Sequence, residues 1–253
     1  MLYALLGAAL VGISLGLLGS GGSILTVPIL VYLLGHEEKA AIAEALAIVG
    51  LISLAGAARA ALRGMVDWRR VLLFGGPGMV GAVLGGLLAR WVPGAAQVAM
   101  LGAIMLIAAY MMARRKDRER PVERPTPALL IILQGLGVGM ITGLVGVGGG
   151  FLIVPALALL GGVPMHTAIG TSLAIITLNC AAGFSKYLTF LEGQGLAIDW
   201  RVIGIFGAVG VGGALVGGSI GSRVNQATLR KWFGVFLVLM GAYILWRQLP
   251  QVV

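Results

Sequence analysis

The sequence predicts an all-α integral membrane protein made of two inverted-topology repeats, each with about five apolar segments. Composition is the first reason: 59% of the 253 residues are hydrophobic and only 11% are charged, whereas a soluble domain carries about 25% charged residues. The second reason is that many apolar runs reach the length of about 20 residues that spans a bilayer. The third is that the two halves of the chain resemble each other. We expect broken or re-entrant helices at the glycine-rich motifs.

The charges fit a lipid bilayer better than a nucleic acid. The net charge is +9, but the basic residues cluster at the ends of apolar segments, as the positive-inside rule describes. The few aromatic residues do not alternate with them as a base-stacking surface requires. With one cysteine and two histidines, the chain lacks the cluster of ligands that a metal site needs. We therefore expect no nucleic-acid partner, no metal and no cofactor.

The second half of the chain repeats the first. Between residues 12–35 and 139–162, which lie 127 positions apart, twelve of 24 positions are identical, and a glycine-rich composition alone would give about three or four. The sequence "DWR" at Asp67–Arg69 returns at Asp199–Arg201, where the offset has grown to 132. These matches identify a true internal repeat.

A charged linker separates the halves. The stretch "ARRKDRERPVERPTP" contains six basic and three acidic residues and cannot lie in a membrane. The expected organisation is a first membrane repeat at 1–113, a cytoplasmic linker at 114–127 and a second membrane repeat at 128–253. The apolar segments are 2–18, 23–35, 40–61, 71–90 and 96–113 in the first repeat, and 128–145, 150–161, 167–189, 201–221 and 230–247 in the second.

An odd number of segments per repeat predicts that the second repeat is inverted. With the linker in the cytoplasm, the basic loops Arg63–Arg70 and 222–231 also fall inside, and the acidic loop 190–200 falls outside. This arrangement satisfies the positive-inside rule. The segments 23–35 and 150–161 are too short for an ordinary span, and the sequence leaves open whether they re-enter or cross.

Glycine runs precede both short segments and predict an anion site. A helix N-terminus presents free N–H groups and the positive end of the helix dipole, and glycine lets the backbone approach a ligand. Pro28 and Pro155 are expected to kink the short helices. Close helix packing is the other interpretation of such glycines, and it suffices for Gly81 and Gly85. The residues expected to bind the anion are Gly19, Ser20, Gly21, Gly22, Ser23, Thr26, Gly146, Gly148, Gly149 and Gly150.

The stretches "GLLGSGGSILTVPIL" and "GLVGVGGGFLIVPAL", followed by "AIAEALAIVG" and "AIGTSLAIIT", resemble the TauE/SafE family of membrane permeases. The resemblance covers nearly the whole chain. It implies a multi-pass permease of a bacterial or archaeal inner membrane that carries a small anion, such as sulfite or a sulfonate, and that is not an enzyme. The first half departs from the pattern, because it has Glu44-Ala45 where the second half has Thr171-Ser172.

Several polar residues inside the apolar segments are further candidates. Glu44 is either a helix cap or a proton-coupling carboxylate. Thr171 and Ser172 either contact the substrate or bond their own helix, and Asn179 is either a substrate contact or an interhelical hydrogen bond. Coupling or gating candidates besides Glu44 are Arg59 and Lys186, which alternatively extend as anchors to the membrane surface.

The leading interpretation is a secondary transporter with an alternating-access cycle, in which a coupled proton is a hypothesis. The substrate would bind between the two glycine-rich helix N-termini. An anion channel or a membrane-embedded enzyme is the alternative, although no set of catalytic residues stands out. The sequence leaves the anion, the direction of transport and the oligomeric state open.

Overall fold

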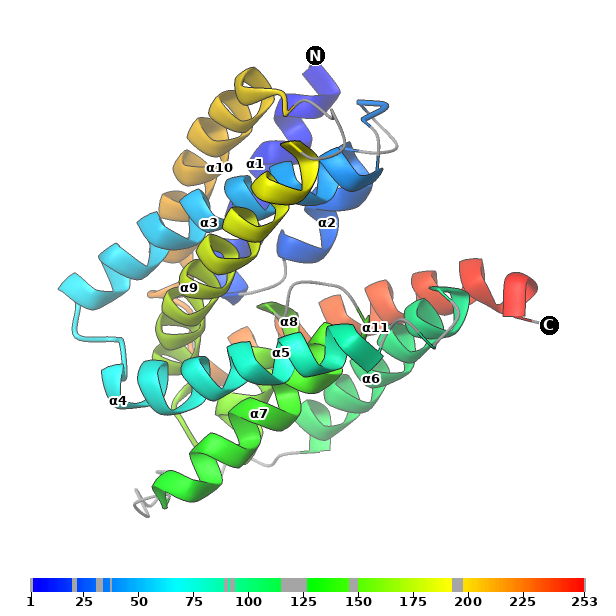
Figure 1. Cartoon of the computed structure of the whole chain (residues 1–253). Helices are drawn as coiled ribbons and strands as arrows, with labels where there is room; N and C mark the ends of the chain where they lie inside the picture. The colour runs from blue at the N-terminus through cyan, green and yellow to red at the C-terminus, as the bar shows by residue number, and fades with distance from the viewer. Residues whose placement is uncertain are drawn as a thin grey trace. The chain divides into compact units, whose positions relative to one another are not determined.

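The computed structural model describes residues 2–19, 22–30, 34–36, 38–88, 91, 94–114, 127–145, 150–192 and 198–252. These residues are helical apart from turns and short loops, and no strand occurs among them (Figure 1). The predicted linker 114–127 lies almost entirely outside them. The helices are α1 (Leu2–Leu18), α2 (Gly22–Pro28), α3 (Glu38–Leu62), α4 (Trp68–Arg70), the π-helical turn η2 (Val71–Gly75), α5 (Gly76–Leu88), α6 (Gly94–Arg114), α7 (Ala128–Val145), α8 (Gly150–Pro155), the π-helical turn η4 (Ala156–Leu160), α9 (Met165–Glu192), α10 (Trp200–Gly221) and α11 (Gln226–Val252).

The helices group into two compact units. The first unit comprises Met1–Asp67 and Ile169–Arg223, so it holds α1, α2, α3, α10 and most of α9. The second comprises Trp68–Ala168 and Val224–Val253, so it holds α5, α6, α7, α8 and α11. Each unit therefore combines helices from both sequence repeats.

The same helix pair occurs once in each unit. In the first unit α1 packs along α10, and in the second α7 packs along α5 (Figure 1). A Cβ atom at Gly12 would lie 2.1 Å from the carbonyl oxygen of Gly210, and one at Gly139 would lie 2.0 Å from that of Gly78. Gly12 and Gly139 are repeat equivalents, as are Gly210 and Gly78. The first segment of each repeat is thus packed, backbone against backbone, on the fourth segment of the other.

Helices α3 and α9, which are repeat equivalents, pack on each other reciprocally within the first unit. A Cβ atom at Gly56 would lie 2.9 Å from Cδ1 of Leu173, and one at Gly183 would lie 3.3 Å from Cδ1 of Leu46. Leu46 and Leu173 are repeat equivalents, as are Gly56 and Gly183. When each of two helices makes the same contact with the other, the contacts are those that a two-fold axis between the helices produces. The contacting residues have increasing numbers along α3 and decreasing numbers along α9, so the two helices run antiparallel.

The order in which residues of α1 and α3 contact α10 also gives the direction of α1 relative to α3. Both helices run parallel to α10, because Ile13 lies near Gly217 on one side of α10 while Leu51 lies near Gly207 and Arg59 near Ser219 on the other. The contacts of Gly12 with Gly210 and of Leu17 with Gly221 rise in the same order. Helices α1 and α3 therefore run in the same direction, so the chain returns toward the starting end of α1 in the residues between them.

Both short segments end in the same way. Gly35 and Gly162, which are repeat equivalents, have φ values of +72° and +65°. The N–H of the residue after each, His36 or Val163, donates to the carbonyl of Leu30 or Leu157 at 3.1 Å. This left-handed glycine satisfies helix carbonyls that would otherwise lack donors. In the second repeat the change from α- to π-helical bonding follows Pro155 directly.

The segment predicted at 71–90 is not a single α-helix. The chain passes from α4 through η2 into α5, and Pro77 follows η2 by two residues. Proline has no N–H and its ring clashes with the carbonyl four residues before it, here Leu73 inside η2, so the turn widens. The equivalent residue in α10 is Val209, and α10 is continuous.

Among the described residues, three helical stretches are long and apolar enough to cross a membrane by length and composition: Ala43–Leu62, Met165–Phe184 and Trp200–Gly221. Shorter apolar stretches occur at Leu5–Leu18, Gly102–Met111 and Ala128–Ile141. The all-helical prediction is confirmed for the part of the chain that the structure describes.

Candidate functional site

The first glycine run is built on a left-handed residue. Gly19 follows α1 with φ +78°, and its N–H donates to the carbonyl of Leu15 at 2.8 Å. A Cβ atom here would lie 2.9 Å from both the Cα of Ile169 and the Oγ of Ser172. Only glycine combines this conformation with this contact, so the turn from α1 toward α2 is tied to α9.

The predicted anion ligands near this turn are partly described. Ser20 and Gly21 lie outside the described residues, and Gly22 begins α2. On α2, Ser23 is half-buried and Thr26 is fully buried. In the second run Gly146, Gly148 and Gly149 lie outside the described residues, and Gly150 begins α8.

The hydroxyls of α9 are engaged with protein groups. Ser172 Oγ lies 3.0 Å from the carbonyl oxygen of Gly19 and 2.8 Å from that of Ile169, to which it donates. Thr171 Oγ1 accepts a hydrogen bond of 2.9 Å from the N–H of Asp67. Both side chains are fully buried. These bonds give both residues a structural role at the ends of helices in the first unit.

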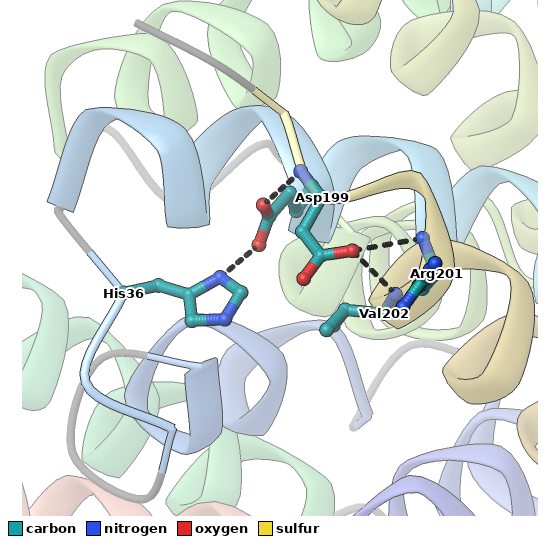
Figure 2. Close-up of polar contacts among 5 residues, drawn as sticks. His36, Asp199, Arg201 and Val202 are labelled. Carbon is teal, nitrogen blue, oxygen red and sulfur yellow. Dashed lines mark hydrogen bonds and ion pairs between the residues drawn. The ribbon is translucent and has the colours of Figure 1, made fainter.

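Figure 2 shows a polar cluster that includes His36, Asp199, Arg201 and Val202. Glu44 bonds both His36 and Asp199 in this cluster. Its carboxylate is buried, with 1% of the side chain exposed. Oε2 lies 2.6 Å from Nδ1 of His36, and Oε1 accepts a hydrogen bond of 2.9 Å from the N–H of Asp199. The Asp199 carboxylate in turn accepts from the N–H groups of Arg201 and Val202 and caps α10. Glu44 therefore links the loop before α3 to the start of α10.

The bond between Glu44 and the N–H of Asp199 has an equivalent in the second repeat. Glu44 and Thr171 are equivalent positions, and so are Asp199 and Asp67. In both halves the side chain on the third segment accepts the N–H of the aspartate that precedes the fourth segment. The second half does so with a neutral hydroxyl and the first half with a carboxylate.

Arg59 on α3 bonds to α10. Its guanidinium donates to the carbonyl oxygen of Leu215 and, at 2.7 Å, to Oγ of Ser219. It thus ties the last turn of α3 to α10. Lys186, its repeat equivalent, is on α9, and its side chain lies outside the described residues.

Two buried oxygen atoms, Ser53 Oγ on α3 and Asn179 Oδ1 on α9, have no hydrogen-bond partner among the described residues. Asn179 was a predicted substrate contact, and Ser53 was not predicted. No group of three or more metal-ligating side chains occurs in the described part of the chain. Cys180, beside Asn179, is buried with a free thiol.

Sequence reasoning missed His36 and Asp199. His36 looked like an ordinary loop residue, and Asp199 was noticed only as part of the repeated "DWR". A comparison of the repeats could have found both, because positions 36 and 44 differ together from positions 163 and 171.

Comparison with known proteins identifies the family. A family model described as "Sulfite exporter TauE/SafE" matches residues 4–248. A "Probable membrane transporter protein" of Xylella fastidiosa is 30% identical over 96% of this chain and 94% of its own. A protein of the same description from Methanocaldococcus jannaschii is 27% identical over 93% of each chain, and one from Haemophilus influenzae is 25% identical over 95% of this chain and 96% of its own.

Proposed function

The chain belongs to the TauE/SafE family, and from that membership we propose that it is a secondary permease for a small anion, with sulfite and related sulfur oxyanions as first candidates. The family description names sulfite export, and the relatives from bacteria and archaea are described as membrane transporters. We place it in the inner membrane as a multi-pass protein with a cytoplasmic linker.

The observation that carries the proposal is the reciprocal, antiparallel packing of α3 on α9. These helices are equivalent in sequence, and antiparallel equivalents are what inverted repeats produce. Helices α1 and α3 run in the same direction, which supports a first short segment that returns across the bilayer. Inverted repeats that contain broken helices are typical of secondary transporters with alternating access.

We propose that the two glycine runs contribute the substrate contacts. Each run precedes a short helix that begins at Gly22 or Gly150, and the family's substrate is an anion that backbone N–H groups can bind. The side chains of Thr171 and Ser172, which bond protein groups, serve to hold the neighbouring turns in place.

Proteoliposome transport tests this function. Counterflow of radiolabelled sulfite should saturate with concentration, whereas a channel need not show saturation. The matched variants are Gly22→Val, which adds bulk at the first glycine run, and Gly212→Ala, whose Cβ would meet no atom within 4 Å. Counterflow should be lost in Gly22→Val and kept in Gly212→Ala. Equal rates in both variants, or no saturable flux of sulfite, thiosulfate, sulfate or sulfonates, would refute the proposal.

A labelling experiment tests the topology. In a Cys180→Ser background, a cysteine introduced at Thr126 should react with an impermeant thiol reagent only after the cells are opened, because we place the linker in the cytoplasm. Labelling of intact cells at this position would contradict the inverted arrangement with both termini outside.

A further inference from the structure

The pair formed by His36 and Glu44 has no counterpart in the second repeat. The equivalent positions carry Val163 and Thr171. The surrounding geometry is nevertheless the same in both halves: a left-handed glycine precedes position 36 or 163, and position 44 or 171 accepts a backbone N–H from an aspartate. At equivalent positions of a duplicated scaffold, one half thus carries two titratable residues and the other carries two neutral ones.

The scaffold itself does not require these charges. Thr171 accepts the N–H of Asp67 with one hydroxyl oxygen, so a neutral acceptor is sufficient for that bond. A carboxylate brings a second oxygen, Oε2, and this is the atom that His36 contacts at 2.6 Å. A buried charge is costly unless it is paired, so a carboxylate at position 44 requires a partner such as His36. The pair therefore does more than the helix link alone requires.

We propose that His36 and Glu44 together form the proton-binding site that couples transport to a proton gradient, a proposal that rests on the transport function proposed above. The geometry suits this role. The Glu44 side chain is 1% exposed, while that of His36 is 19% exposed, so the imidazole is the partly accessible member of the pair. A proton bound to the imidazole would change the net charge of the pair from −1 to 0. Its release restores the charge of −1.

Among the described side chains, the other charged groups near the pair are bonded elsewhere or exposed. The Asp199 carboxylate accepts the N–H groups at the start of α10, so only its backbone N–H faces Glu44. Arg201 follows it on the exposed face of α10. Among the described residues on α3, α10 and the loop at 34–36, no other titratable side chain is bonded to the pair. The imidazole is therefore the group that compensates the carboxylate.

Loss of the proton has a structural consequence. With a neutral imidazole, the buried carboxylate keeps only neutral hydrogen-bond donors, and a buried charge with such partners is poorly stabilised. The contacts that Glu44 makes with the loop at His36 and with Asp199 would then loosen. Proton binding at the pair would therefore affect how the loop before α3 is held against the start of α10.

Imidazole NMR tests the proton site without any transport assay. The chain has two histidines, so His166→Gln leaves His36 as the single imidazole signal in isotopically labelled protein. We expect its resonances to change with pH, because the imidazole is proposed to bind the proton, and we expect Glu44→Gln to alter that change. A signal that does not change with pH, or a curve that Glu44→Gln leaves unaltered, would overturn the proposal.

Replacing His36 and Glu44 by the residues at the equivalent positions of the second repeat tests the coupling. The double variant His36→Val/Glu44→Thr gives the first half the residues of the second, in a geometry the fold already accommodates. We expect accumulation driven by a pH gradient to fall to the level without a gradient, while counterflow remains measurable and shows that the protein is folded. Full gradient-driven accumulation in this variant would overturn the coupling role.

The single variants complete the design. Glu44→Thr alone removes the carboxylate and keeps the acceptor for Asp199, and it should lose driven accumulation as the double variant does. If wild-type protein shows no saturable anion flux but the His36 titration depends on Glu44, the proton site stands and the proposed transport function fails. If flux is present and the titration is absent, the transport function stands and the proton site fails.

Discussion

The packing of α1 on α10 leads to a sharp prediction at Gly12. In Gly12→Ala the new Cβ would lie 2.1 Å from the carbonyl oxygen of Gly210 and 2.8 Å from its Cα. Ordinary contact begins at 3.4 Å, so the two helices would have to separate by about 1.3 Å, the difference between 3.4 Å and 2.1 Å. The obstacle is backbone and cannot rotate away. Overpacking costs about 1–3 kcal/mol or more.

The control is Gly212→Ala on α10, where a Cβ meets nothing within 4 Å. This variant should be neutral or gain up to about 1 kcal/mol, because alanine has the higher helix propensity. The apparent melting temperature in detergent, followed by tryptophan fluorescence, should therefore be clearly lower for Gly12→Ala than for Gly212→Ala. In the second unit Gly139→Ala and its control Gly137→Ala should behave as the same pair. Equal melting temperatures within each pair would refute the inference that these backbones touch.

Four further variants test single contacts by the same measurement. Gly19→Ala should destabilise by about 1–3 kcal/mol, because it forces alanine to φ +78° and against Ser172 Oγ; an unchanged melting temperature would contradict the left-handed turn. Arg59→Met should cost about 1–2 kcal/mol through the loss of two charged hydrogen bonds to α10, and Ser219→Ala should cost less. Ser53→Ala should be neutral or stabilising, because it removes a buried hydroxyl without a partner; a clear loss of stability would show that Ser53 Oγ has an unseen partner.

The sequence was sufficient to predict helices, the repeat and the places where the helices break. The two short segments begin at the predicted glycine runs, because Gly22 and Gly150 are the first residues of α2 and α8. This succeeded because glycine and proline act on the local backbone. The π-helical turn η2 was missed, since its cause, Pro77, has no equivalent in the other repeat.

Side-chain partners could not be predicted in the same way. Thr171 and Ser172 were candidates for the substrate, and their partners Asp67 and Gly19 are about 100 and 150 residues distant in sequence. Such bonds depend on how α9 packs with segments of the other repeat, which no local pattern encodes. Glu44 was recognised as a buried acid among apolar residues, but its pairing with His36 depends on the turn at Gly35.

The pairing of helices across repeats also restricts how a transport cycle can operate. The first helix of each repeat lies against the fourth helix of the other without room for a methyl group, as at Gly12 and Gly139. A movement of one whole repeat against the other would require these helix pairs to slide, and tightly packed interfaces do not deform continuously. We therefore infer that α1 and α10 move together if the protein alternates between states.

A disulfide between α1 and α10 tests this inference. A Cβ at Gly221 would lie 3.7 Å from the Cα of Leu17, so the two positions are direct neighbours across the contact between α1 and α10. Leu17→Cys/Gly221→Cys in a Cys180→Ser background should form the cross-link on oxidation, and counterflow of the substrate anion should be the same before and after. The reduced protein is the internal control, and a shift in electrophoretic mobility measures cross-linking. If oxidation stops counterflow and reduction restores it, α1 must move against α10 during the cycle, and the repeats would be the moving bodies after all.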